Sequence, residues 1–176
     1  MSLLFLLFAL IVFLFCITVI VFSFFNILSM TMNGAFFAPS GKKLTDKMVA
    51  LARIKPGEKA LDLGSGDGSQ VISLAKAGAK AYGYEINPLL VWWSQYRLWQ
   101  AGLKGKAFIY TKNFWQADLS DFDVIIIFGI PYMMKKMEKK LMQELKPGAR
   151  VISNAFPFPN WQHSKREGNL YLYEVE

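Results

Sequence analysis

Three glycines and two acids stand close together in the stretch Asp62-Leu63-Gly64-Ser65-Gly66-Asp67-Gly68. The stretch follows a short apolar run at 59–63 and precedes a helical pattern at 68–77, so it predicts a turn between a strand and a helix. Glycines at such a turn let the backbone bend tightly and let a ligand approach without a Cβ in the way. The sequence therefore predicts a ligand-binding loop at 62–68.

The acids in this loop decide which ligand it suits. A dinucleotide loop reads G-x-G-x-x-G, but Ser69 breaks that spacing. The carboxylate of Asp67 also competes with a pyrophosphate for the amides at the helix start and repels it. A ligand that is cationic and carries no phosphate fits better, and S-adenosylmethionine has a sulfonium and an amino group. In the alternative interpretation Asp67 only caps the helix, and the two roles are compatible.

Two more predicted strands end in polar residues. Glu85 closes the strand at 80–86 and lies nineteen positions after Gly66, about where an acid holds a ribose. The alternative for Glu85 is a solvated acid at a strand end. Asn113 follows the strand at 107–111, and Phe114 and Trp115 beside it could stack on an adenine. Loop, acid and polar-aromatic triplet at three successive strand ends together predict one cofactor site.

Strands and helices alternate along the chain, and this alternation would bring the three strand ends to one edge of a parallel sheet. The strands are apolar on both faces, which is typical of a parallel sheet covered by helices, so we expect an α/β, Rossmann-like, mostly parallel sheet. In the helix after Asn87, the residues Trp92, Tyr96 and Trp99 share one face and are interpreted as a packing stripe, and Arg97 as a surface charge. Strands are predicted at 59–63, 80–86, 107–111, 123–128, 150–155 and 170–175, and helices at 44–53, 68–77, 88–100 and 132–145.

The stretch 3–25 is apolar and uncharged, and the first Lys or Arg of the chain is Lys42. About 20 apolar residues span a bilayer as a helix, so we expect a single-pass membrane anchor at 1–28, a connector at 29–43 and one domain at 44–176. A cleaved signal peptide is the alternative, but the basic start and the A-x-A-like exit are missing. The lysines after the span place the domain in the cytoplasm, or in the mitochondrial matrix if the protein is organellar.

The net charge of +7 does not by itself indicate nucleic acid. The densest basic run, 135–140, fits the wet face of a helix, and no basic stretch interleaves with aromatic residues. The single Cys16 and single His163 offer no metal cluster. We therefore expect no nucleic-acid partner and no metal.

The chain resembles a known family in the stretches DLGSGDG, GYEINPLLVWWSQYR, FGIPYMM, EKKL and FPFPNW. It is similar to the seven-β-strand S-adenosylmethionine-dependent methyltransferases. Within them it looks like the membrane-anchored protein lysine methyltransferases that modify the ATP synthase c-subunit and the adenine nucleotide translocase, and their prokaryotic relatives. The resemblance runs from about Phe37 to the carboxyl end.

The resemblance implies a cofactor site made of the glycine loop and three neighbouring segments. Phe37 and Pro39 would close over the cofactor, and Glu85 would bind the ribose. Asn113 stands where the family usually carries an acid. After the fifth strand the sequence leaves room for only one more, so the fold is expected to be shortened at its carboxyl end. The cofactor-binding residues implied are Phe37, Pro39, Asp62, Gly64, Ser65, Gly66, Asp67, Gly68, Glu85, Asn113, Phe114 and Trp115.

A substrate pocket is expected after the fourth and fifth strands, at Pro131, Tyr132, Phe156, Pro157 and Trp161. The alternatives are that the first two only begin a helix and that the last three pack on the final strand. Gly129-Ile130 replaces the polar pair that orients a nucleobase in D/N-P-P-Y enzymes. No catalytic base is assigned. The expected function is methyl transfer to a lysine of a membrane-associated protein; the alternatives are a lipid or lipophilic substrate, or a cofactor-binding module without catalysis.

Overall fold

The computed structural model describes residues 3–31 and 41–176. The chain divides into two compact units, Met1–Phe36 and Phe37–Glu176. The first unit contains one helix, α1 (Leu3–Thr31), which continues three residues beyond the expected end of the anchor. Its 22-residue stretch Leu3–Phe24 is long and apolar enough to cross a membrane, and none of it is buried in the structure.

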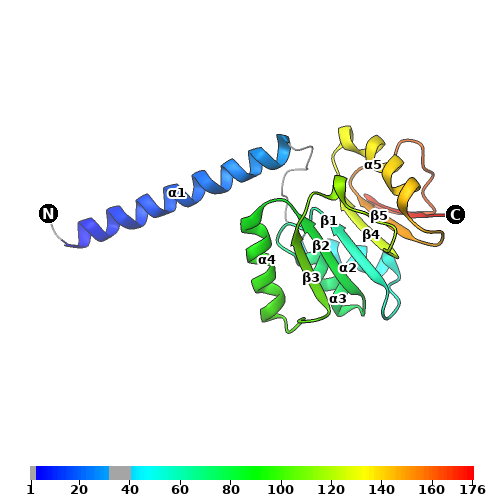
Figure 1. The fold of residues 1–176 in the computed structure, drawn as a ribbon, viewed down its shortest axis with the longest axis horizontal. Helices are drawn as coiled ribbons and strands as arrows, with labels where there is room; N and C mark the ends of the chain where they lie inside the picture. Colours follow the sequence, from blue (N-terminus) through cyan, green and yellow to red (C-terminus); the bar gives the residue numbers. More distant parts are fainter. Residues whose placement is uncertain (1–2, 32–40) are drawn as a thin grey trace. The chain divides into compact units, whose positions relative to one another are not determined.

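The second unit is built on a seven-stranded sheet with the order β3-β2-β1-β4-β5-β7-β6 (Figure 1). The first five strands are parallel, β7 runs antiparallel to β5, and β6 runs antiparallel to β7. The α/β, mostly parallel sheet is therefore confirmed. The strands are β1 (Lys59–Leu63), β2 (Lys80–Glu85), β3 (Ala107–Thr111), β4 (Val124–Phe128), β5 (Arg150–Asn154), β6 (Lys165–Glu167) and β7 (Leu170–Glu174).

Helices cover both faces of this sheet. The chain moves from β1 outwards to β3 and then from β4 outwards to β5, so right-handed crossovers place α3 and α4 on one face and α5 on the other. One core cluster joins α2, α3 and α4 to the small strand residues Ala60 and Ala81. On the other face α5 buries Met137 and Leu141. The helices are α2 (Lys42–Ala52), α3 (Ser69–Lys76), α4 (Pro88–Gln100), the 3₁₀ turn η1 (Phe114–Gln116) and α5 (Pro131–Glu144).

The carboxyl end of the fold differs from the expectation of a shortened sheet. Two strands follow β5, because β6 pairs with β7 across a turn in which Gly168 has a positive φ of 61°. The strand β6 has only three residues, all charged and exposed, so it carries no apolar alternation that could reveal it. Charges on such a strand also protect the sheet edge from pairing with another chain.

The expected packing stripe of α4 was also wrong. Trp92, Tyr96 and Trp99 are 67%, 40% and 70% exposed. The helix buries instead the face formed by Leu90, Val91, Ser94 and Leu98. The spacing correctly predicted a shared face, but the smaller side chains fit the close contact with the sheet.

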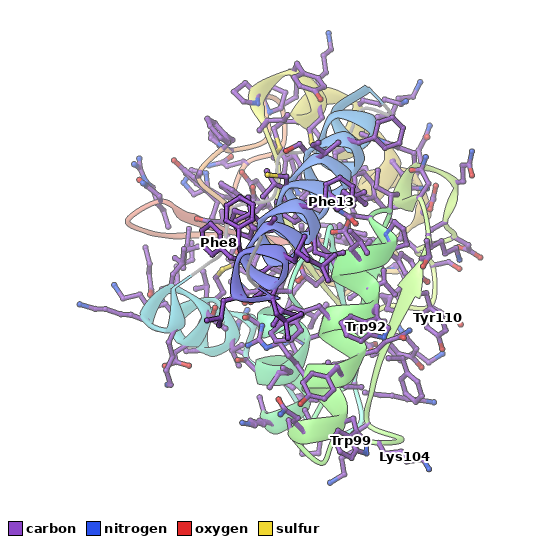
Figure 2. The ribbon with its side chains drawn as sticks, turned by 90° about the vertical axis from the view of Figure 1, so that its left-hand side faces the viewer. Phe8, Phe13, Trp92, Trp99, Lys104 and Tyr110 are labelled. Carbon is purple, nitrogen blue, oxygen red and sulfur yellow. The ribbon has the colours of Figure 1, made fainter. Side chains whose placement is uncertain are left out.

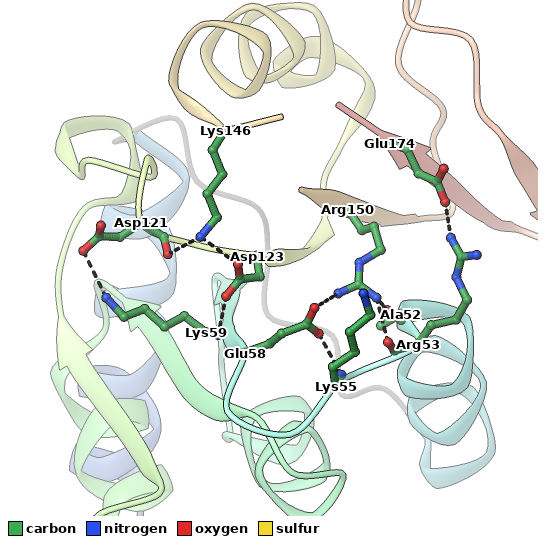
Figure 3. A network of polar contacts seen from close by, with 10 residues as sticks. All are labelled: Ala52, Arg53, Lys55, Glu58, Lys59, Asp121, Asp123, Lys146, Arg150 and Glu174. Atoms are coloured by element: carbon green, nitrogen blue, oxygen red, sulfur yellow. Dashed lines mark hydrogen bonds and ion pairs between the residues drawn. The ribbon is translucent and has the colours of Figure 1, made fainter. Parts of the chain in front are cut away.

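Charged residues at the amino ends of the strands form a network of ion pairs (Figure 3). Arg150, at the start of β5, pairs with Glu58 at 2.5 Å and also donates to the carbonyl oxygens of Ala52 at 2.7 Å and Arg53 at 2.6 Å. The side chain of Arg150 is only 8% exposed. The guanidinium therefore ties the end of α2 to the sheet.

The same end of the sheet has three more pairs. Lys146 lies 2.7 Å from Asp123, Lys59 lies 3.1 Å from Asp121, and Arg53 pairs with Glu174. Asp123 also accepts a hydrogen bond from the backbone N–H of Lys59 at 2.7 Å. Every carboxylate named here thus faces a cation.

Candidate functional site

The loop between β1 and α3 has the backbone conformation that its glycines predict. Gly64, Gly66 and Gly68 have φ values of 84°, 50° and 76°, in the left-handed region that favours glycine. The N–H groups of Gly64 and Ser65 both donate to the carbonyl oxygen of Tyr84, at 2.9 and 3.0 Å. A Cβ on Gly64 would meet nothing within 4 Å. The loop is therefore fixed against β2 from one side and leaves open space at Gly64.

Two glycines allow close packing beneath this loop. A Cβ on Gly68 would lie 2.8 Å from the Cβ of Ser94 and 2.9 Å from the Cδ1 of Ile109. A Cβ on Gly83, in the middle of β2, would lie 2.6 Å from the hydroxyl oxygen of Ser65. Sequence reasoning did not single out Gly83 or Ser94. A glycine inside a strand was the available signal, because it often marks a close approach of another segment.

Glu85, at the carboxyl end of β2, holds the loop through backbone amides. Its Oε2 accepts from the N–H of Gly66 at 3.0 Å, and its Oε1 accepts from the N–H groups of Ile86 and Asn87, both at 2.8 Å. The residue is 8% exposed. A carboxylate has about four acceptor positions, so Glu85 can accept a further hydrogen bond from a ligand.

Asp62, at the carboxyl end of β1, is buried and 5% exposed. Burial, together with the negative charges of Glu85 and Asp67, raises the pKa of Asp62 from 3.8 to about 8. Within residues 3–31 and 41–176, no Lys or Arg forms an ion pair with Asp62 or Glu85. The site therefore favours a ligand that brings positive charge.

Asp67 is the acid of the loop whose charge is compensated. It accepts from the N–H and the hydroxyl of Ser69, at 3.1 and 2.8 Å, at the start of α3. Arg97 of α4 pairs with its carboxylate and donates to its carbonyl oxygen at 2.7 Å. The interpretation of Arg97 as a surface charge was thus wrong, because this side chain ties α4 to the loop.

Asn87 caps the helix α4, and Asn113 caps the short turn η1, at the same edge of the sheet. Asn87 Oδ1 accepts from the N–H of Leu89 at 3.0 Å and begins α4, as the sequence predicted, while its buried Nδ2 has no partner among the described residues. Asn113 Oδ1 accepts from the N–H of Trp115 at 2.9 Å. The amide nitrogen of Asn113, a donor, and the second lone pair of its oxygen remain for a ligand.

The aromatic residues beside Asn113 differ in exposure. Phe114 is 7% exposed, and Trp115 is half-buried with the Nζ of Lys136 lying 4.4 Å from its ring centroid. The ring centroids of the two are 5.1 Å apart. Their expected role, stacking on an adenine, stays a prediction. Phe37 and Pro39, expected to close over the cofactor, lie outside the described residues.

The expected substrate residues follow the carboxyl ends of β4 and β5. Pro131 and Tyr132 begin α5, and Tyr132 is 61% exposed. Phe156 is half-buried and Pro157 exposed, and Trp161 packs beside the Tyr173 ring of β7 at 5.0 Å between centroids. These contacts place Trp161 on the last strands, while its role toward a substrate stays a prediction.

Ala155, directly after β5, has a φ of 71°, which an alanine rarely adopts. Such strain is often found beside functional sites, because the surrounding structure must hold it in place. Here the Ala155 N–H donates to the carbonyl oxygen of Asn169 at 2.9 Å, and the Ser153 hydroxyl donates to that of Phe156 at 2.6 Å. Sequence patterns gave no signal for this conformation.

Comparison with known proteins adds to this geometry. The family model for the ANTKMT methyltransferase domain matches residues 62–165. The ATP synthase c-subunit lysine N-methyltransferase of Mus musculus is 46% identical over 143 residues, which cover 79% of this chain and 58% of the mouse protein. This chain therefore spans less than two thirds of that relative.

Two further relatives are matched over most of their length. A protein-lysine N-methyltransferase of Saccharolobus islandicus (strain REY15A) is 31% identical over 149 residues, which cover 79% of this chain and 92% of that protein. The crystal structure of an RNA methyltransferase from Salinibacter ruber, in complex with S-adenosyl-L-homocysteine, superimposes with a TM-score of 0.73 at 29% identity. That match covers 78% of this chain and 92% of the other.

Proposed function

Because the chain belongs to the family of the ANTKMT methyltransferase domain, we propose that it transfers methyl groups from S-adenosylmethionine to a lysine side chain of a membrane protein. Two matched relatives are named lysine N-methyltransferases, and one of them is named for the c-subunit of the ATP synthase. The observation that carries the proposal is the pair of buried carboxylates, Asp62 and Glu85, at a glycine loop where no described Lys or Arg pairs with them.

The residues present fit this cofactor. S-adenosylmethionine supplies a methyl group bound to a sulfonium sulfur. The methyl group passes to the nucleophile in a single displacement, and the sulfur leaves as a neutral thioether. The open space at Gly64 admits a ligand next to the backbone, and Glu85 can accept from ribose hydroxyls. A cationic ligand would favour the ionised form of Asp62, and the carboxylate of Glu85 would repel a phosphate. The loop therefore supports S-adenosylmethionine over a nucleotide phosphate.

The substrate lysine must lose a proton before it can attack. With a pKa near 10.4, only about one lysine in a few thousand is neutral at pH 7. Removal from water lowers this pKa, and aromatic walls after β4 and β5 would provide such a setting. Tyr132 and Phe156 stand in these positions. Their rings would also accept the methylated ammonium product, because aromatic faces attract cations.

We assign α1 as a membrane anchor. Its stretch Leu3–Phe24 has the length of a bilayer span, and Lys42, Lys43 and Lys47 follow it, which supports the cytoplasmic or matrix side for the domain. Anchoring raises the local concentration of a lysine that lies at the bilayer surface. This supports a membrane protein as the substrate.

The experiment that tests the proposal follows a labelled methyl group. The full chain is incubated with methyl-labelled S-adenosylmethionine and membranes from cells that lack the protein, with the Glu85→Gln variant as the blank. We expect label in a membrane protein and a lysine peptide whose mass has increased by one or more methyl groups. Label confined to extracted lipid, or to RNA as the Salinibacter ruber relative suggests, would overturn the choice of substrate.

A further inference from the structure

The outer side of α4 and the neighbouring edge strand β3 carry six large exposed side chains, which we call the α4 aromatic face. Trp92 and Trp99 are 67% and 70% exposed, more than any other described aromatic side chain of the second unit. In Figure 2 both lie along α4, with Lys104 near Trp99 and Tyr110 on the neighbouring strand. The face consists of Leu89, Trp92, Trp93, Tyr96, Trp99 and Tyr110.

The four rings on α4 form one continuous surface. Tyr96 stands between its neighbours, with its ring centroid 6.5 Å from Trp92, 5.7 Å from Trp93 and 5.9 Å from Trp99. A shallow groove of about 310 Å³ continues the surface from Trp99 to Tyr110 of β3. Contiguous exposed apolar patches of this kind mark interaction sites rather than ordinary surface.

The stretch of chain that carries the face contains only basic charges. From residue 87 to residue 116 the sequence contains no Asp or Glu, but it contains Arg97, Lys104, Lys106 and Lys112. Arg97 faces the loop through Asp67, and the Nζ of Lys112 lies 4.7 Å from the Tyr84 ring centroid, so Lys104 and Lys106 remain for the outer side. Lys104 lines the groove together with Trp99 and Tyr110.

We propose that the α4 aromatic face rests on the surface of a lipid bilayer that contains anionic headgroups. Tryptophan and tyrosine favour the membrane interface because their rings are apolar and carry one polar group. Lys104 beside them adds attraction to anionic lipids, and residues 87–116 contain no acid that would oppose it. The inference rests on the proposed anchorage of α1, since a chain held at the bilayer offers this face to the lipid continuously.

This placement has a consequence for the site. The inner side of α4 touches the loop through Arg97 and through Ser94 beneath Gly68. The helix also begins just after Glu85, at the carboxyl edge of the sheet. Contact of the outer side with lipid therefore holds that edge near the headgroups, where a lysine of a membrane protein leaves the bilayer.

The test uses the full chain in lipid nanodiscs of phosphatidylcholine and phosphatidylserine. Tryptophan emission is compared between discs made with brominated and with ordinary acyl chains, because bromine quenches only indoles that contact it. The variant Trp92→Gln/Trp99→Gln removes the two most exposed indoles, and neither belongs to the buried side of α4. The control is Met142→Gln on α5, which also replaces an exposed apolar side chain, 55% exposed.

We expect brominated lipid to quench roughly a third or more of the wild-type emission, since three of the five tryptophans lie on this face and interfacial indoles reach the acyl boundary. The double variant should lose most of this quenching, and the control should keep it. Discs without phosphatidylserine should quench less. Equal emission from a disc-bound wild-type chain in both lipids would overturn the inference but not the anchor, and methyl transfer is measured separately.

Two other outcomes also overturn it. A chain that elutes free of the discs removes both the anchor and this inference. A detergent-purified chain that is dimeric through Trp92 and Trp99, and stays unquenched in discs, would assign the face to a second copy instead.

Discussion

The two ends of the central sheet differ in whether their acidic side chains are paired with cations. At the amino ends of the strands, Glu58, Asp123 and Asp121 each face a Lys or Arg (Figure 3). At the carboxyl ends, Asp62 and Glu85 are buried without such a partner among the described residues. The first arrangement stabilises the fold by itself. The second is complete only with a cationic ligand, so the sheet separates stability from binding.

The largest effect is expected from Arg150→Met at the amino end. The substitution leaves Glu58 and two carbonyl oxygens without their donor, and breaking one side of a buried pair lowers the free energy of unfolding by about 3–5 kcal/mol. The matched control Lys59→Met breaks the exposed pair with Asp121 and should change it by less than about 1 kcal/mol. Denaturant unfolding in detergent measures both. Equal losses would show that the network is not what stabilises this end.

Glu85→Gln, at the carboxyl end of the sheet, is expected to lower the affinity for the cofactor. The amide has one acceptor oxygen in place of two, so it cannot accept from Gly66, Ile86 and Asn87 and also from a ribose. Cofactor affinity should therefore fall by about 100-fold, or about 2.7 kcal/mol. The counterpart Glu58→Gln, at the other end, should lower stability and leave cofactor affinity unchanged. Binding calorimetry measures the cofactor affinity of both variants, and denaturant unfolding measures their stability. A Glu85→Gln chain that binds like wild type would remove the ribose assignment.

The raised pKa of Asp62 predicts that stability and cofactor affinity depend on pH. Its folded-state pKa of about 8 lies above the unfolded value of 3.8, so its contribution to stability is complete below pH 3.8 and is lost as the pH rises through about 8. A cationic ligand favours the ionised carboxyl, so binding should release a proton at pH 7. Affinity should then rise with pH up to about 8, by at most about tenfold per pH unit.

The Asp62→Asn variant is the control for this dependence. It should bind about tenfold more weakly at pH 8, show no rise in affinity between pH 6 and 8, and release no proton. Calorimetry in two buffers of different ionisation enthalpy counts the protons. Identical proton counts for wild type and variant would argue against a carboxyl that ionises on binding.

The smallest effect is expected from Asn113→Asp. The oxygen of Asn113 already accepts from the Trp115 N–H and keeps one lone pair, whereas an aspartate has a second oxygen that would accept from the adenine amino group. Affinity for the cofactor should rise by roughly threefold, in line with a single net hydrogen bond. A weaker-binding variant would mean that Asn113 uses its amide nitrogen toward the ligand.

The sequence predicted most of the fold because its strands are strongly apolar and its turns carry glycine. The bounds of β1, β3 and α4 agree with the prediction. It missed β6, whose three exposed charges carry no pattern. It also placed the aromatic residues of α4 inside, because periodicity shows that residues share a face but not which face meets the sheet.

The candidate site could be located but not completed from the sequence. The loop at Gly64 and Glu85 follows from local spacing. The Arg97–Asp67 pair links residues thirty positions apart, and Gly83 of β2 makes room for Ser65 of the loop after β1. Such contacts depend on which elements become neighbours, which a single sequence does not contain.

Binding calorimetry on the detergent-purified full chain tests the central claim most directly. The uncompensated carboxylates at the carboxyl edge predict a saturable heat with S-adenosylmethionine, and none with ATP or NADH at the same concentrations. Saturable heat with either phosphate ligand, and none with S-adenosylmethionine, would contradict the account.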